Sequence, residues 1–228
     1  MSWKKLYIIG VGPGDESYIT PAARAKVAEC DLLLSSQRLT RLFDRPIRKL
    51  DLKGDPPAAV QFILENRARL KIGVLVSGDP GLYSFLGVIS NYLGQDEFEV
   101  VPGISSVQLA FARLKLGWED ACILSLHGRD ADGGRDADGL AGAVAQHPTV
   151  AVLTDGRWTP REIARDLLGH GIEDREVIIC ENLSYPEERI TVSDVRGALA
   201  SADSRGLSVV IIRKRKGCPE SSQASSTE

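Results

Sequence analysis

Three apolar segments of the chain each lead directly into a loop rich in glycine or proline. The first loop is 10–14 (G-V-G-P-G), which follows the apolar residues 6–9. The second is 77–81 (S-G-D-P-G), which follows 72–76, and the third is 100–106 (V-V-P-G-I-S-S). Short apolar runs that end at glycine or proline are typical of buried strands. Because ligands bind outside the carboxyl ends of the strands in open α/β sheets, the three loops together predict one ligand site.

The first loop differs from the loop that binds dinucleotides. That fingerprint, G-x-G-x-x-G, opens directly into a helix whose N-terminus binds the pyrophosphate. Here Pro13 interrupts the motif and is followed by Asp15 and Glu16, two carboxylates that would repel a pyrophosphate. The helix is expected to begin only after Thr20, with Pro21 in its first position. The sequence therefore disfavours NAD or FAD as the ligand.

Expected strands and helices alternate along much of the chain. In the first half, strands are expected at 6–9, 32–35, 72–76 and 98–101, and helices at 21–29, 58–69, 83–93 and 106–116. In the second half, strands are expected at 122–126, 150–153, 176–180, 189–192 and 207–213, and helices at 160–168 and from 193. The alternation in the first half is typical of a mostly parallel sheet.

A break in this pattern near residues 117–120 predicts two domains in an α/β fold. We expect an N-terminal α/β domain at 1–118, a C-terminal α/β domain at 119–216 and a Ser-rich disordered tail at 217–228. Clefts between domains are common places for small-molecule sites, so a cofactor cleft is expected between the two.

The composition argues against several classes of protein. The formal net charge of −3 gives no general attraction to nucleic acid. The four cysteines contain no C-x-x-C pair, and the Asp- and Gly-rich repeat at 129–139 lacks the glutamate that closes a calcium loop, so we expect no metal and a solvated loop there. No segment approaches the roughly 18 apolar residues of a membrane span, and no signal peptide is visible. We therefore expect a cytoplasmic protein.

Charged residues near expected strand ends suggest an anionic ligand. Basic residues are concentrated in the stretch 38–53, and Arg38 and Arg129 each follow an expected strand. They are candidates to pair with carboxylates, although an ordinary solvated surface is the alternative. His127 stands at the end of an apolar strand and is expected to face the crevice at the strand ends where the ligand would bind. No nucleophile motif, acid, base or metal set is evident, which suits a reaction whose reactive group arrives with a cofactor.

The three loops resemble motifs of the tetrapyrrole (corrin/porphyrin) methylase superfamily. Residues 10–14 are similar to its G-x-G-P-G opening, 77–84 (S-G-D-P-G-L-Y-S) to its G-D-P loop, and 101–106 to its V-P-G-x-S loop. The resemblance extends to about residue 213, and the second and third motifs at this spacing are specific. A nucleotide-binding regulatory module without catalytic activity stays open as the alternative outside this superfamily.

Three further segments are most similar to the CbiE type within this superfamily. They are 34–39 (L-S-S-Q-R-L), 111–118 (F-A-R-L-K-L-G-W) and 125–129 (S-L-H-G-R). The enzymes of this type methylate C5 of the corrin ring during cobalamin synthesis. Methylation of uroporphyrinogen, of another precorrin position, of ribosomal RNA or in diphthine synthesis remains the alternative within the superfamily.

The resemblance implies S-adenosylmethionine as cofactor, a tetrapyrrole as substrate and a homodimer. It implies cofactor contacts at Pro13, Gly78, Asp79, Leu82, Ser105, Ser106, Thr154 and Leu183, the last two on weaker matches. Substrate contacts are expected at Arg38, Tyr83, His127 and Arg129. The chain lacks the second methyltransferase domain of fused relatives, so a separate CbiT-type C15-methyltransferase and decarboxylase is a possible partner. The catalytic residue and the presence of cobalt in the substrate are left open.

Overall fold

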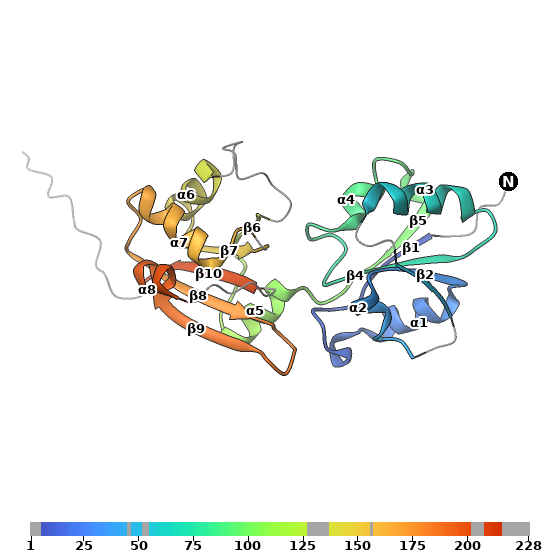
Figure 1. Ribbon diagram of the computed structural model, residues 1–228, viewed down its shortest axis with the longest axis horizontal. Coiled ribbons are helices and arrows are strands. Elements are labelled where there is room, and N and C mark those ends of the chain that lie inside the picture. Colours follow the sequence, from blue (N-terminus) through green and yellow to red (C-terminus); the bar gives the residue numbers. More distant parts are fainter. Residues whose placement is uncertain are drawn as a thin grey trace, which may run out of the picture. The chain divides into compact units, whose positions relative to one another are not determined.

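The computed structural model describes residues 6–44, 47–51, 55–126, 137–155, 157–201 and 208–215. The chain divides into two compact units, each with its own sheet (Figure 1). The first unit comprises Met1–Leu116 together with Asn182–Glu188, and the second comprises Gly117–Glu181 with Arg189–Glu228. The segment 182–188 therefore belongs to the first unit, although its neighbours in the sequence belong to the second.

The first unit contains a parallel sheet of five strands. In spatial order they are β3 (Arg48–Leu50), β2 (Leu32–Leu34), β4 (Ile72–Val76), β1 (Leu6–Gly10) and β5 (Phe98–Val101). Every neighbouring pair in this sheet is parallel, as the alternation of strands and helices predicts. All residues of β1, β2 and β4 are buried, which is why these strands are continuous apolar runs in the sequence.

Helices cover both faces of this sheet (Figure 1). On one face, α1 (Pro21–Glu29) and α2 (Gln37–Thr40) pack over Tyr7 and Ile9 of β1. On the other face, α3 (Pro56–Asn66) and α4 (Phe85–Ile89) pack over Leu6 and Ile8. The alternation of side chains along a strand thus divides β1 between two hydrophobic cores. The remaining elements of the unit are α5 (Ser106–Leu114) and the short helices η1 (Glu16–Tyr18) and η2 (Gln95–Glu97).

Helix α1 begins at the residue that its capping signals predict. The Thr20 side chain accepts a hydrogen bond from the backbone N–H of Ala23 at 3.1 Å, and Pro21 occupies the first helical position. This start leaves 11–19 as a loop between β1 and the helix, so the first glycine-rich loop does not open into a helix as in dinucleotide-binding proteins.

The second unit contains a mixed sheet with helices packed on one face. Its order is β6 (Cys122–Ser125), β7 (Thr149–Leu153), β10 (Ser208–Lys214), β8 (Arg175–Glu181) and β9 (Arg189–Asp194). Among the described strands of this second sheet, only β6 and β7 form a parallel pair, and the other neighbouring pairs are antiparallel. The helices α6 (Ala137–Gln146), α7 (Pro160–Gly169) and α8 (Val195–Ala200) contribute to one core over this sheet.

Most of the expected elements are present, with three differences. The short α2 and β3 are absent from the elements expected from the sequence, and no bounds are expected there for α6. The expected helix at 83–93 is shorter, because α4 spans only Phe85–Ile89. The predicted boundary between residues 118 and 119 stays a prediction, and the predicted tail at 217–228 and the repeat at 129–136 lie outside the described residues. No helix within the described ranges combines the length and the apolar composition that crossing a bilayer requires.

Candidate functional site

The three glycine-rich loops meet at the carboxyl end of the first sheet. A side-chain carbon added at Gly10 would lie 2.6 Å from the carbonyl oxygen of Gly78 and 2.7 Å from the nitrogen of Gly103. One added at Gly103 would overlap the same Gly78 oxygen and lie 2.7 Å from the carbonyl carbon of Gly10. Only glycine permits backbones to approach this closely. We call this contact of Gly10, Gly78 and Gly103 the glycine junction.

Backbone hydrogen bonds join the first two loops beside the glycine junction. The N–H of Gly78 donates to the carbonyl of Gly12 at 2.8 Å, and the N–H of Val11 donates to the carbonyl of Val76 at 3.0 Å. Gly12 and Gly78 have φ angles of 81° and 69°, which L side chains rarely adopt. The loop geometry therefore depends on glycine at both positions.

Asp79 joins the second loop to the third. One of its carboxylate oxygens accepts a hydrogen bond from the N–H of Gly81 at 2.8 Å, within its own loop. The other accepts from the N–H of Gly103 at 3.0 Å, which belongs to the third loop. Both carboxylate oxygens thus accept charge-assisted bonds from the backbone, which are the stronger kind. The structure places Asp79 as a brace between two loops.

Ser105, in the third loop, lies close to the glycine junction. Ser105 is buried, and its Cα lies 3.5 Å from a side-chain carbon placed at Gly78. Its hydroxyl accepts from the N–H of Gln108 at 3.1 Å, and the Gln108 side chain accepts from the N–H of Ser105 at 2.8 Å. This reciprocal capping fixes the start of α5, with Ser106 as its first residue.

Leu82 and Tyr83 follow Asp79 in the second loop. The N–H of Leu82 donates to the Asp79 carbonyl at 3.2 Å. Tyr83 has a φ angle of 48°, an uncommon conformation for a bulky residue, and its side chain is 52% exposed. Strained residues of this kind are concentrated at functional sites. Pro13, in the first loop, is buried.

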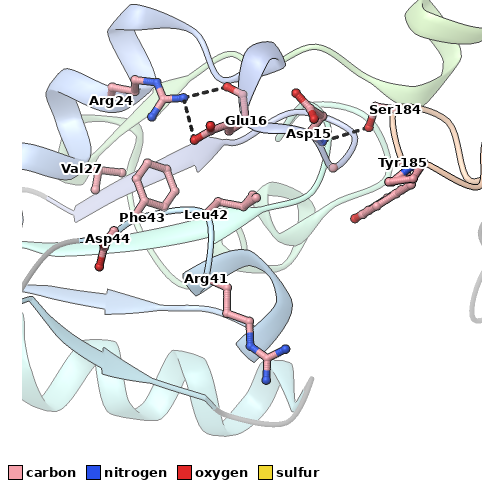
Figure 2. A pocket seen from close by; sticks show the side chains of 12 residues that line it. Asp15, Glu16, Arg24, Val27, Arg41, Leu42, Phe43, Asp44, Ser184 and Tyr185 are labelled. Atoms are coloured by element: carbon pink, nitrogen blue, oxygen red, sulfur yellow. Dashed lines mark hydrogen bonds and ion pairs between the residues drawn. The ribbon is translucent and has the colours of Figure 1, made fainter.

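The segment 182–188 is fastened to the first unit by polar contacts. The Ser184 hydroxyl accepts from the N–H of Asp15 at 3.0 Å (Figure 2). The Glu188 carboxylate accepts from Nε of Arg113 at 2.6 Å and from the N–H of Ser184 at 2.7 Å. The hydrogen bond from Arg113 lowers the pKa of Glu188 below its ordinary value. Leu183, expected to contact the cofactor, is only 5% exposed within this segment.

Tyr185, which the sequence analysis missed, lies in this segment against the first loop. A side-chain carbon added at Gly14 would lie 2.7 Å from the Tyr185 hydroxyl oxygen and would overlap the phenol ring. The same hydroxyl accepts a hydrogen bond from Nη1 of Arg38, which lies on α2. The structure thus brings Arg38 and the first glycine loop together through a residue from the far end of the chain.

A cavity of about 630 Å³ lies beside Tyr185 in the first unit. Its lining is Gly14, Asp15, Glu16, Arg24, Val27, Arg41, Leu42, Phe43, Asp44, Ser184, Tyr185 and Pro186 (Figure 2). Arg24 donates to the carbonyl oxygen of Glu16 at 2.8 Å and lies 3.9 Å from its carboxylate. The lining of the cavity therefore combines apolar side chains with charged ones.

Three other expected site residues belong to the second unit or lie outside the described residues. Thr154 is in the second unit, where its buried hydroxyl lies 2.9 Å from the carbonyl oxygen and 2.6 Å from the hydroxyl oxygen of Ser208. His127 and Arg129 lie outside the described residues. Within the described ranges, no three or more His, Cys, Asp and Glu side chains are grouped to hold a metal ion.

The chain is similar to known proteins along nearly its whole length. The probable cobalt-precorrin-7 C(5)-methyltransferase of Methanocaldococcus jannaschii is 31% identical over 214 residues, covering 90% of this chain and 96% of the relative. The cobalt-precorrin-7 C(5)-methyltransferase of Salmonella typhimurium is 32% identical over 211 residues, covering 92% and 100%. The solved structure of precorrin-6Y methylase (CbiE) from Archaeoglobus fulgidus has a TM-score of 0.70 at 23% identity and covers 93% of this chain and 98% of that one, which shows a shared fold. A model of the Tetrapyrrole (Corrin/Porphyrin) Methylases matches residues 5–198, and the chain therefore belongs to this family.

Proposed function

We propose that this protein transfers the methyl group of S-adenosylmethionine to C5 of a precorrin or cobalt-precorrin ring in cobalamin biosynthesis. The observation that carries the proposal is its identity of 31–32% to C(5)-methyltransferases, over nearly the full length of both chains. S-adenosylmethionine as the methyl donor is further supported by the structure of uroporphyrin-III C-methyltransferase from Thermus thermophilus in complex with S-adenosylhomocysteine (TM-score 0.72, 24% identity, covering 92% of this chain and 97% of that one).

The glycine junction brings three loops together at one edge of the sheet. Gly10, Gly78 and Gly103 allow these loops to pack backbone against backbone, which suits a single ligand site formed by all three. When bound, S-adenosylmethionine supplies an electrophilic methyl group on its sulfonium. The chain then needs to orient the donor and the ring carbon, hold them at reacting distance and exclude water. We assign these tasks to the three loops, including Pro13, Asp79, Leu82 and Ser105–Ser106, with Thr154 and Leu183 as further proposed contacts, and we name no catalytic residue.

We further propose a partner protein and a homodimeric assembly. Precorrin-6Y C(5,15)-methyltransferase [decarboxylating] of Mycobacterium tuberculosis matches 81% of this chain but only 45% of its own length. The name of that relative includes C15 methylation and decarboxylation, and we propose that a separate protein performs these steps alongside this one. We also propose a homodimer that acts in the cytoplasm on a small tetrapyrrole.

Isothermal calorimetry will test the cofactor. We expect S-adenosylmethionine and S-adenosylhomocysteine to bind with similar affinity, because the loops contact the shared part of both molecules, and we expect no heat from NAD. Binding of NAD without binding of either sulfur compound would contradict the proposal.

The reaction itself is tested with S-adenosylmethionine carrying an isotope-labelled methyl group. Metal-free and cobalt-containing C5-unmethylated precorrins are offered separately, and uroporphyrinogen III serves as the control substrate. We expect label at C5 of one precorrin, located by NMR. Label only in uroporphyrinogen, or at another ring position, would place the protein elsewhere in its family.

Arg38→Ala tests the expected substrate contact. We expect KM for the tetrapyrrole to rise roughly tenfold with kcat and cofactor affinity unchanged, because a carboxylate contact is lost equally from bound substrate and transition state. Added salt should shrink the difference, and Arg129→Ala should behave similarly. Arg69→Ala removes the same charge from an exposed site beyond α3 and is the control. If Arg38→Ala matches Arg69→Ala at low salt, the substrate lies elsewhere and the stretch 38–53 is an ordinary solvated surface.

A further inference from the structure

We infer that Tyr185 is a positioning residue for the substrate, acting through Arg38. This inference rests on the proposed function, because it assigns Tyr185 to the binding of a ring substituted with carboxylates. It starts from a three-way contact within the first unit. The phenol ring of Tyr185 lies against Gly14, and its hydroxyl accepts a hydrogen bond from Nη1 of Arg38.

Arg38 needs an anchor if it is to bind a carboxylate. It is exposed on α2, a helix of four residues, and a free arginine side chain loses conformational freedom when a ligand fixes it. A hydrogen bond from one guanidinium N–H to Tyr185 orients the group before the ligand arrives. Arginine has five N–H donors, so the remaining donors stay available for a carboxylate.

The two acidic residues that follow the first loop are already engaged by other partners. Asp15 accepts the N–H of Ser17 at 2.8 Å, and the hydrogen bonds from Ser17 lower the pKa of Asp15. The Glu16 carboxylate lies 3.9 Å from Nη2 of Arg24. In Figure 2, Glu16 and Arg24 face each other, away from Tyr185. Among the residues that the structure describes, Arg38 is therefore held by a neutral hydroxyl and pairs with no carboxylate, which keeps its charge available to an anion.

Gly14 is part of the same arrangement. Its backbone leaves the space that the Tyr185 ring fills, and any side-chain carbon there would displace the ring. The glycine at the end of the first loop thus has a purpose separate from the glycine junction, namely to admit Tyr185. The segment 182–188 that carries Tyr185 is fastened by Ser184 and Glu188, so the hydroxyl is presented from a fixed backbone.

The test is a double-mutant cycle of Tyr185→Phe and Arg38→Ala, read as KM for the tetrapyrrole. Tyr185→Phe removes only the hydroxyl, and we expect KM to rise roughly fivefold to tenfold, with kcat, S-adenosylmethionine affinity and melting temperature unchanged. The double variant should match Arg38→Ala alone, because Tyr185 has no effect once Arg38 is absent.

A second variant reaches the same contact without touching a polar group. Gly14→Ala should displace the ring and raise KM as Tyr185→Phe does, whereas Gly87→Ala, where an added carbon meets no atom within 4 Å, should leave KM unchanged. An unchanged or lower KM for Tyr185→Phe, or additive effects in the double variant, would overturn the inference while a methylating wild-type protein keeps the proposed function. If the wild-type protein itself transfers no methyl group, the proposed function fails first.

Discussion

Gly103→Ala is expected to destabilise the first unit and to abolish detectable binding of S-adenosylmethionine. The added methyl group would overlap the Gly78 carbonyl oxygen and lie 2.7 Å from the carbonyl carbon of Gly10. Both neighbours are backbone atoms and cannot rotate away, so the loops must separate. Overpacking of this kind costs about 3 kcal/mol of unfolding free energy, which is a fall in melting temperature of roughly 6–12 °C for a chain of this size.

The control for this variant is Gly87→Ala on α4, where the added methyl group meets open space. Thermal unfolding and calorimetry with S-adenosylhomocysteine are measured for both variants. Wild-type stability and wild-type ligand affinity in Gly103→Ala would show that the glycine junction neither supports the fold nor forms the cofactor site.

Asp79→Ala is expected to weaken S-adenosylmethionine binding roughly 10- to 100-fold, more than it weakens folding. The substitution leaves the N–H groups of Gly81 and Gly103 without their carboxylate acceptor, and hydrogen bonds to charged groups contribute about 1.5–3 kcal/mol each. The second and third loops then lose the brace that sets their spacing. Part of this cost appears in the free energy of unfolding, but we expect the larger effect on binding of the ligand, because both loops belong to the proposed cofactor site.

Asp79→Asn is the matched variant, because its amide oxygen can still accept one of the two backbone hydrogen bonds. Its affinity should lie between those of the wild type and Asp79→Ala. A lowered melting temperature with an unchanged dissociation constant would make Asp79 a purely structural residue.

The parts of the fold that could be predicted from the sequence are those with strong local signals. The start of helix α1 could be predicted because two strong signals are adjacent in the sequence: the capping residue Thr20 and the proline in the first helical position. Strands β1 and β4 are continuous apolar runs, since both of their faces are buried. In contrast, α2 and β3 have four and three residues, which is too short for a hydrophobic period to be visible.

Strand direction in the second sheet could not be predicted from the same signals. Apolar strands look alike in parallel and antiparallel pairs, and the direction depends on how the chain connects them. Only seven residues, 182–188, join β8 to β9, and strands joined so briefly are antiparallel. The sequence analysis recognised both strands but did not use the length of their connection.

The candidate site divides in the same way. The loops carrying Gly78, Asp79 and Ser105 are recognisable because each follows its own strand directly. Tyr185 was missed because its contact with Arg38 joins residues 147 positions apart, and no local pattern records such a pair. The sequence feature that could have indicated Tyr185 is its position two residues after Leu183, which the family resemblance implies as a cofactor contact.

The position of the segment 182–188 also constrains how the protein is made. The N-terminal part of a chain emerges first from the ribosome, and it begins to fold while later parts are still being synthesised. Residues up to Leu116 emerge first, but Ser184, Tyr185 and Glu188 follow only after the intervening 117–181 have been translated. The nascent first unit can form its sheet early, whereas Arg38 and Arg113 acquire these partners only after residues 117–181 have been made. The anchoring of Arg38 thus comes later in biogenesis than the synthesis of the strands and helices around it.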